Sequence, residues 1–277
     1  MIIKFYIKIS LFIVFIFPLF TMDIKAETNI KGEIIAGGIV IVETRPGAIV
    51  KLDGEIIPIS DQGYGLVGFE RQPKNTQNLK IIHSTDEIEN ITLNIKKRSY
   101  KIQRIEGLQK EKVEPPKALL DRIYEERLRV KKSRLEAGLL KTPYYLNGII
   151  MPANGPITGI YGSQRILNGI SKSPHYGLDI ALSVGHSVLA PMDGVVVFTD
   201  SDLFYSGGTI IISHGQALTT SYLHLSKILV KNNQKVLKGE IIGEVGATGR
   251  VTGAHLHWGA EWMGKRIDPE YLLRLLK

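Results

Sequence analysis

The chain has 277 residues, a formal net charge of +8 and no cysteine. This length suits one large domain or two modest ones. The absence of cysteine excludes disulfide bonds and a cysteine-built lipid anchor, so a metal site would have to use His, Asp or Glu. The positive charge favours an anionic polymer such as a cell wall or a membrane surface as partner, unless it serves solubility alone.

The N-terminus has the three parts of an export signal. Lys4 and Lys8 precede an apolar run over 9–20, and the small residue Ala26 follows. The uncharged apolar run is about 14 residues, shorter than the roughly 20 that a membrane-spanning helix needs, although a retained anchor is the alternative. We therefore expect residues 1–26 to be a cleaved signal. The mature protein, with a net charge of +6, would be periplasmic or otherwise in the cell envelope, with no stable membrane anchor and no nucleic-acid partner.

Residues 27–112 predict a small β-rich accessory domain. In "AIVKLDGEIIPI" the pair Asp53 and Gly54 separates two β-prone runs, which is a strong signal for a hairpin. Residues 90–105 alternate between apolar and polar side chains over much of their length, as a half-buried strand does. We expect His83 to be an ordinary surface residue, and nothing else here indicates catalysis.

Residues 113–141 predict a proline-rich break followed by a charged helix. The break is "VEPP", and the helix is expected over 117–137, with Gly138 as its stop. Glu125 and Arg129 have the spacing of an intrahelical ion pair. An apolar stripe predicts that one face packs on a neighbour: Leu119, Leu120, Ile123, Tyr124, Leu128 and Leu135. A partner-binding role for the basic face is the alternative.

Residues 142–277 predict an all-β domain large enough for its own core. Segments such as "DGVVVFTD", "GGTIIISHG" and "GEIIGEVG" are typical of strands. We expect a mostly β protein whose C-terminal domain is a β-sandwich or barrel-sandwich. Six of the seven histidines lie in this domain, and we interpret His186 and His214, both near turns, as structural or surface residues.

The sequence "GAHLHWG" places His255 and His257 two residues apart, so that in a strand both point to one face. His175 and Asp179 would lie about 13 Å apart in an ideal strand. The backbone must therefore bend between them, and Gly177 is placed to allow it. One histidine of the pair, added to His175 and Asp179, would give three protein ligands and an open fourth position, the arrangement of catalytic zinc.

Four further motifs connect these residues to a known family. "HYGLDIA", "VLAPMDGVVVF", "SYLHLS" and "VLKGEIIGEVGATGRVTGAHLHW" follow one another in the C-terminal domain. In this order they resemble the lysostaphin-like (LytM-type) zinc metallopeptidases, which hydrolyse the peptide part of peptidoglycan. The resemblance implies that His175, Asp179 and His257 bind zinc. It implies that His224 and His255 are the paired histidines that are not ligands and that act on the water or on the oxyanion.

The family resemblance also frames the predicted function. It implies an exported zinc-dependent endopeptidase that hydrolyses peptide cross-links in peptidoglycan stems, at a bond from D-alanine to a diamino acid or at a glycine bridge. Arg165 and Tyr161 are candidates to border the substrate groove, or else they are surface residues. The alternative function is a non-catalytic wall-binding protein, or an activator of another wall hydrolase with a regulatory partner in the envelope. A carrier domain is rejected because no Met-Lys-Met occurs, and a serine hydrolase because no G-x-S-x-G occurs.

Overall fold

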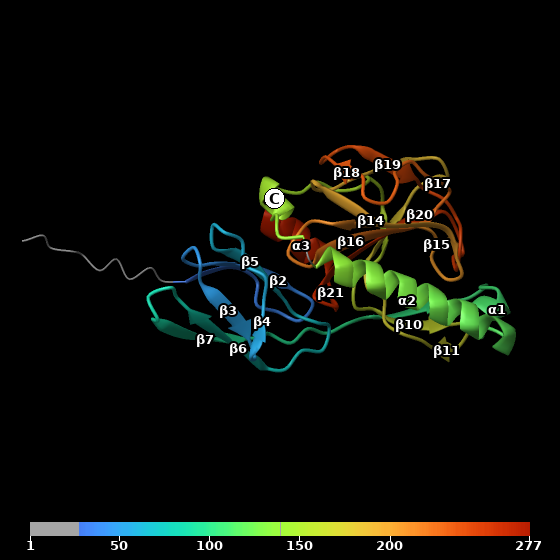
Figure 1. Ribbon diagram of the computed structural model, residues 1–277. Coiled ribbons are helices and arrows are strands. Elements are labelled where there is room, and N and C mark those ends of the chain that lie inside the picture. The colour runs from blue at the N-terminus through green and yellow to red at the C-terminus, as the bar shows by residue number, and fades with distance from the viewer. Residues whose placement is uncertain (1–27, 139) are drawn as a thin grey trace, which may run out of the picture.

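The computed structural model describes residues 28–138 and 140–277 of the chain. The predicted signal, residues 1–26, lies outside the described residues. Strands make up most of the regular structure, and one long helix lies between the N-terminal sheets and the C-terminal sheets in the chain (Figure 1). The prediction of a mostly β protein with a connecting helix is confirmed.

Two small antiparallel sheets form the N-terminal part. One contains β1 (Asn29–Gly32), β2 (Ile39–Glu43) and β5 (Tyr64–Gly68), and the other contains β3 (Ile49–Leu52), β4 (Glu55–Ile56), β6 (Thr76–Ile82) and β7 (Ile88–Asn94). The predicted hairpin joins β3 to β4. Asp53 and Gly54 have φ values of 49° and 90°, and positive φ at both central residues is what a two-residue type I′ turn requires.

The prediction that His83 is a surface residue is wrong. His83 is 2% exposed, and its Nε2 lies 2.6 Å from Oε1 of Glu89 on β7. The other oxygen of that carboxylate accepts a hydrogen bond from the backbone N–H of Thr28. A buried imidazole needs a polar partner, and Glu89 supplies it.

Residues 90–105 do not form one strand, because β7 ends at Asn94 and β8 (Ile102–Ile105) belongs to another sheet. β8 pairs in parallel with β10 (Gln164–Leu167), which in turn pairs with β11 (Ile170–Ser171). The expected accessory domain, 27–112, therefore contains a strand that pairs with the C-terminal part. The predicted boundaries at 112 and 142 divide residues that lie in one sheet.

The predicted helix is present, but its buried face differs from the expected one. A short helix α1 (Lys110–Val113) and a 3-10 turn η1 (Lys117–Leu119) precede α2 (Leu120–Ala137). The buried residues of α2 are Ile123, Glu126, Ser133 and Ala137. Four residues of the predicted stripe are exposed instead: Leu120, Tyr124, Leu128 and Leu135.

The C-terminal end of α2 is confirmed, but its ion pairs differ from the expected one. The helix ends at Ala137 with Gly138 as its C-cap, although the φ of −63° at Gly138 is helical rather than left-handed. Arg129 forms an ion pair of 2.7 Å with Asp200, and Glu126 forms one of 2.7 Å with Arg122. The expected pair between Glu125 and Arg129 is replaced because Asp200, on a neighbouring strand, offers Arg129 a carboxylate.

The C-terminal part is built on one large antiparallel sheet. Its strand order is β18-β14-β15-β16-β20-β12-β9, with β21 also paired to β20. The members are β9 (Ile157–Gly159), β12 (Leu178–Ala181), β14 (Gly194–Leu203), β15 (Gly207–Ser213), β16 (Leu218–Leu225), β18 (Lys235–Val236), β20 (His255–Trp262) and β21 (Lys265–Ile267). A 3-10 turn η2 (Tyr144–Asn147) precedes the sheet, and helix α3 (Pro269–Leu276) follows it.

One face of the large sheet packs into a continuous core. A second sheet of β13 (Ser187–Leu189), β19 (Ile241–Glu244) and β17 (Lys227–Ile228) contributes Val188 and Ile242 to this core, which gives a sandwich. Trp258 and Trp262 of β20 point into the same core, together with Val40 and Leu66 of the N-terminal part. The two parts of the chain therefore share one core.

The opposite face of the sheet carries α2 at one side (Figure 1). Val130 of α2 packs on Phe198 of β14 and Ile211 of β15, and the Ser213 hydroxyl donates to the Ala137 carbonyl. His255 and His257 point to this same face, because they alternate along β20 with the core residues Leu256 and Trp258. Among the helices of the described residues, none is long and apolar enough to span a membrane.

Candidate metal centre

Two neighbouring strands bring together two of the three predicted metal ligands. Asp179 of β12 and His257 of β20 are directly paired across the strands, so their side chains share a face. His175 lies in the loop before β12, and the chain bends at Gly177, as predicted. The reason for glycine is space, because a Cβ at Gly177 would lie 2.6 Å from Nε2 of His257. The loop can therefore fold back over His257.

The donor atoms of the three residues converge. Nε2 of His175 lies 3.0 Å from Nδ1 of His257 and 3.0 Å from Oδ1 of Asp179. Nδ1 of His257 lies 2.8 Å from the same carboxylate oxygen. Two imidazoles and one carboxylate fit the ligand set of a zinc ion with an open fourth position. Among the described residues, this is also the group of three whose donors all lie within 4.8 Å of one another.

The protonation states suit a cation. Although burial opposes it, the neighbouring imidazoles of His175 and His257 hold the pKa of Asp179 well below its usual range, so the carboxyl is ionised. Burial lowers the pKa of His257 to about 4, against the opposing effect of Asp179. The His175 Nδ1–H donates to the Ile160 carbonyl over 3.1 Å, which leaves Nε2 as the nitrogen with a lone pair. Metal ligands need these deprotonated forms.

His224 and His255 lie beside this cluster and face each other, with ring centroids 4.8 Å apart. The His224 Nδ1–H donates to the Thr248 carbonyl, and the His255 Nδ1–H donates to the Gly253 carbonyl, each over 2.9 Å. A carbonyl only accepts, so both rings keep Nε2 free to accept a proton. Burial, and then the charges of His255 and His257, lower the pKa of His224 to about 3.

Arg165 lies at the metal centre. From β10 its guanidinium donates to Oδ2 of Asp179 over 2.9 Å, which leaves Oδ1 toward the two imidazoles. This bond orients the carboxylate, as partners of metal ligands commonly do. Tyr161, by contrast, is wholly buried, and its hydroxyl donates to the Arg266 carbonyl. The expectation that Tyr161 borders an open groove is wrong, because Tyr161 is a packing residue.

The remaining histidines of the C-terminal part are separate from the cluster. His214 is fully buried, and its two ring nitrogens bond to the Asp193 carbonyl and the Thr220 hydroxyl. His186 is exposed. The structural and surface interpretations of these two residues are confirmed.

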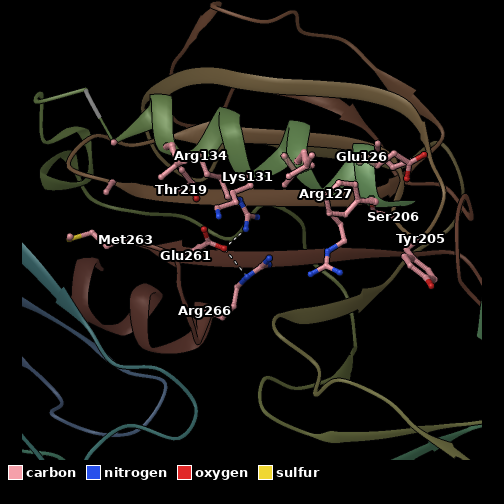
Figure 2. A pocket seen from close by; sticks show the side chains of 18 of the residues that line it. Glu126, Arg127, Lys131, Arg134, Tyr205, Ser206, Thr219, Glu261, Met263 and Arg266 are labelled. Carbon is pink, nitrogen blue, oxygen red and sulfur yellow. Dashed lines mark hydrogen bonds and ion pairs between the residues drawn. The ribbon is translucent and has the colours of Figure 1, made fainter. Parts of the chain in front are cut away.

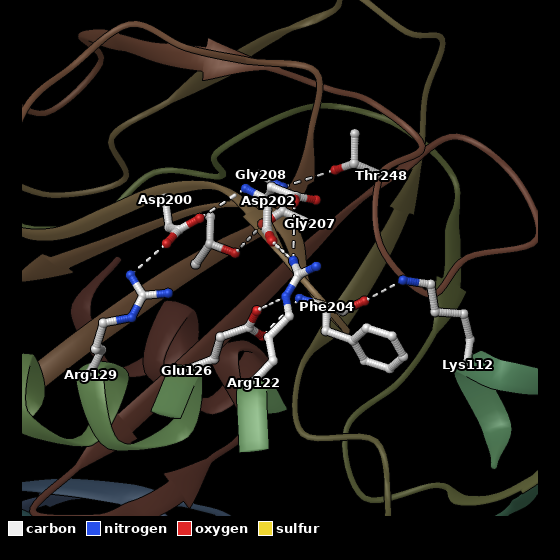
Figure 3. A network of polar contacts seen from close by, with 11 residues as sticks. Lys112, Arg122, Glu126, Arg129, Asp200, Asp202, Phe204, Gly207, Gly208 and Thr248 are labelled. Atoms are coloured by element: carbon white, nitrogen blue, oxygen red, sulfur yellow. Dashed lines mark hydrogen bonds and ion pairs between the residues drawn. The ribbon is translucent and has the colours of Figure 1, made fainter. Parts of the chain in front are cut away.

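A polar network connects α1 and α2 to the hairpin between β14 and β15 (Figure 3). The buried carboxylate of Glu126 accepts the Phe204 N–H over 2.8 Å, and the Lys112 ammonium donates to the Phe204 carbonyl over 2.8 Å. The next residues of this β14–β15 hairpin hold the histidine, because the His224 N–H donates to the Ser206 carbonyl over 2.8 Å. The sequence offered one signal for this network, a glutamate in the middle of the helix on the side of Ile123.

The hydrogen bond from the His224 backbone N–H to the Ser206 carbonyl helps to position the His224 imidazole, because both groups belong to the same residue. The hydroxyl of Thr248 extends the contact, because it accepts the Gly208 N–H over 2.9 Å and donates to the Leu225 carbonyl over 3.0 Å. The backbone around His224 is therefore stabilised by α2, through the hairpin, and by the turn that contains Thr248.

A groove of about 1050 Å³ runs beside α2 on the same sheet face (Figure 2). At its floor Glu261 pairs with both Arg134 and Arg266. Burial, and then the charge of Arg266, lower the pKa of Arg134 to about 9, although Glu261 opposes this. Arg127 and Lys131 also line the groove, and neither has an ion pair among the described residues. Two cations without an ion pair in the described part of the chain therefore line this groove, together with the carboxylates of Glu55 and Glu126.

The fold and the site together define a metallohydrolase-like domain: a β-sandwich with two histidines and one aspartate converging on one sheet face. The model of Peptidase family M23 matches residues 173–269, and the chain carries a domain of this family. The predicted resemblance to LytM-type peptidases is therefore confirmed.

Three comparisons describe the relatives. The chain is 50% identical over 106 residues to the peptidoglycan DD-endopeptidase ShyA of Vibrio cholerae, which covers 38% of this chain and 24% of ShyA. It is 35% identical over 101 residues to the murein hydrolase activator NlpD of Escherichia coli, which covers 36% of this chain and 26% of NlpD. A crystal structure from Pseudomonas aeruginosa, described as a peptidase M23, aligns with a TM-score of 0.61 at 26% identity, over 87% of this chain and 95% of that chain.

The extent of these matches differs. The chain spans about a quarter of the length of ShyA and of NlpD, whereas its alignment to the Pseudomonas structure includes most of both chains. The family match begins at residue 173, after α2 and after Arg165. The helix and the strand that carries Arg165 therefore lie outside the matched family segment.

Proposed function

We propose that the chain is an exported zinc-dependent endopeptidase that hydrolyses peptide cross-links of bacterial peptidoglycan. The convergence of His175, Asp179 and His257 carries the proposal, since three protein donors leave one position for the reacting groups. The match of residues 173–269 to family M23 and the likeness to ShyA support a peptide bond of peptidoglycan as the target. A bond from D-alanine to a diamino acid is the first expected target, and a glycine bridge is the alternative.

The proposed roles of the residues follow from their free atoms. Zinc, when bound, would polarise the scissile carbonyl and make a water molecule more acidic. Nε2 of His224 or of His255 would take the proton of the attacking water and later give it to the leaving amine, as a general acid–base group does. The imidazolium formed in between would stabilise the negative oxygen of the tetrahedral intermediate. Arg165 would keep Oδ1 of Asp179 toward the metal position.

The test uses purified sacculi and the chain from residue 27 onward, loaded with zinc. We expect about one equivalent of zinc and the release of soluble muropeptides, identified by mass spectrometry. His175→Ala should lose both the metal and the release, because the cluster would keep only two donors. A folded, zinc-loaded protein that releases no muropeptide would refute the enzymatic function.

A second candidate function is activation of another wall hydrolase, and the likeness to NlpD supports it. The two functions differ in their need for the metal ligands. An activator would stimulate a second hydrolase as well with His257→Ala as with the unchanged residue. An endopeptidase would lose its own release of muropeptides in the same variant.

We also propose two features of the chain's organisation. Residues 1–26 would direct export, and N-terminal sequencing of the protein recovered from the cell envelope would test cleavage after Ala26. The peptidase unit would begin near residue 98 rather than at 142, because β8 pairs with β10 and α2 packs on the large sheet.

A further inference from the structure

Arg250 projects from the turn that supports both of the histidines that are not metal ligands. A bridge between Gly246 and His255 closes this turn at its base. Within the turn, the Thr248 carbonyl accepts the His224 Nδ1–H and the Gly253 carbonyl accepts the His255 Nδ1–H. Arg250 therefore belongs to the turn that positions both imidazoles.

The contacts of the Arg250 guanidinium are specific but contain no carboxylate. The guanidinium lies over the Tyr205 ring, 4.6 Å from its centroid, and one nitrogen reaches the Lys112 carbonyl at 3.5 Å. The Arg250 backbone N–H donates to the Tyr205 carbonyl over 2.8 Å. Within the described residues, no ion pair joins Arg250 to an acidic side chain. The charge is half-buried and lacks a counterion.

Arg165 of β10 contributes a second guanidinium beside the predicted metal ligand Asp179. One of its nitrogens donates to Asp179, but its Nε is buried and has no hydrogen-bond partner among the described residues. Burial, and then the charge of Arg165, lower the pKa of Arg250, so the two positive charges influence each other. Asp179, which is also a predicted metal ligand, pairs with Arg165, whereas Arg250 has no carboxylate partner among the described residues.

Buried or half-buried charges in proteins are normally paired, because removing them from water is costly. Because Asp179 pairs with Arg165 and no carboxylate pairs with Arg250 among the described residues, the two guanidiniums carry an excess of positive charge, and a metal cation would increase that excess. A bound anion would restore the balance. Arginine is suited to a carboxylate because its planar fork can donate two parallel hydrogen bonds.

We propose that Arg250 binds a free carboxylate on the substrate residue next to the scissile peptide bond, with the positive charge of Arg165 nearby. This inference rests on the proposed peptidase function and deepens it. A cross-link to a diamino acid with two carboxyl groups carries such a carboxylate, on the carbon that bears the scissile nitrogen. A glycine bridge, or a diamino acid with one carboxyl group, has no carboxylate at that place. Arg250 would therefore select the cross-link to a diamino dicarboxylic acid.

The test uses two cross-linked muropeptide dimers that differ in one group. In one dimer the carboxylate beside the scissile bond is free, and in the other it is amidated. Their kcat/KM values are measured with the zinc-loaded protein, with Arg250→Gln and with Arg250→Lys. Arg104→Gln is the matched control, because Arg104 is exposed on β8 and its replacement removes the same charge.

We expect the unchanged protein to cleave the free-carboxylate dimer on the order of 10- to 100-fold faster, the effect of a charge-assisted hydrogen bond. Arg250→Gln should bring the ratio near one by slowing the free-carboxylate dimer alone, with zinc content unchanged. Arg250→Lys should keep part of the preference, and Arg104→Gln should keep all of it. A ratio near one in the unchanged protein would refute the inference, as would an equal loss on both dimers in Arg250→Gln, which would indicate a purely structural role.

Calorimetry with the zinc-free protein separates this inference from the proposed function. Without turnover, the free-carboxylate dimer should still bind more tightly than the amidated one, and Arg250→Gln should remove the difference. If neither dimer is cleaved but this binding preference holds, the endopeptidase function fails and the carboxylate site stands. Equal binding of both dimers by the unchanged protein would refute the carboxylate site.

Discussion

Exchanging His255 and His257 for alanine, one at a time, separates metal binding from proton transfer. The two histidines are two residues apart on one strand face, yet the donor cluster includes His257 and not His255. The Nε2 of His255 lies 3.7 Å from Oδ1 of Asp179, whereas the Nδ1 of His257 lies 2.8 Å from it. We therefore expect His257→Ala to lose zinc and activity, and His255→Ala to lose activity alone.

The magnitudes follow from what each ring contacts. Groups that only orient a ligand contribute about 10- to 100-fold to metal affinity, so removing the ligand His257 should cost at least that much. His255 donates to the Gly253 carbonyl, and its Nε2 lies 3.7 Å from the Asp179 carboxylate. Its replacement should leave the zinc content near one equivalent. Loss of an acid–base group should lower the rate on the order of 10²–10⁴-fold.

The assay measures zinc by elemental analysis and muropeptide release by mass spectrometry, with folding checked by circular dichroism. His186→Ala is the control, because His186 is exposed and lies apart from the cluster. A folded His255→Ala protein without zinc, together with a His257→Ala protein that keeps it, would reverse the ligand assignment. Full activity in both variants would place the reaction elsewhere in the molecule.

Three further predictions concern stability. Glu126→Ala removes the buried acceptor of the Phe204 N–H and should lower the free energy of unfolding in urea by about 1–3 kcal/mol. Glu125→Ala, at an exposed position, should change the free energy of unfolding by less than about 0.5 kcal/mol. Equal effects of the two variants would show that α2 does not stabilise the hairpin. Burial lowers the pKa of His214 to about 4, so the unfolded chain takes up this proton first. The free energy of unfolding is therefore highest above the unfolded pKa of about 6.5, and it falls by about 3 kcal/mol as the pH drops toward 4. His214→Gln should make the free energy of unfolding less dependent on pH in this window. An unchanged pH dependence in His214→Gln would contradict the assignment. The fragment 142–277 lacks β8 and α2 and should melt at a lower temperature than 98–277 in calorimetry, and equal melting would favour the boundary expected from the sequence.

The metal cluster could be predicted because each part of it is encoded locally. His255 and His257 stand in one strand, and alternation alone sets them on one face. His175 and Asp179 are separated by a glycine, and the need for a bend between them follows from strand geometry. What joins the two pieces is the pairing of β12 with β20, which only the family resemblance supplied.

The buried face of α2 could not be predicted from its apolar stripe. Tyr124 and Leu128 are exposed, while Glu126 is buried. The reason is that the partner surface is a strand hairpin with free backbone groups, and the Phe204 N–H needs an acceptor. The apolar pattern of a helix does not show whether its partner surface has a backbone N–H that needs an acceptor. The expected boundary at 112 left out the pairing of β8 with β10 for a related reason, because this pairing joins residues about 60 positions apart.

We expect metal binding and substrate selection to depend on different contacts. Asp179 and His257 lie on adjacent strands of the M23 domain, and their pairing does not involve the N-terminal residues. Arg250 and Tyr205 instead form a wall that contacts Lys112, a residue that precedes the family match. A change in the α1 region should therefore alter which cross-link is accepted before it alters the zinc. If both depended on the same contacts, Lys112→Ala, which removes the ammonium bond to the Phe204 carbonyl, would lower zinc content and carboxylate preference together. We expect it to reduce the preference alone.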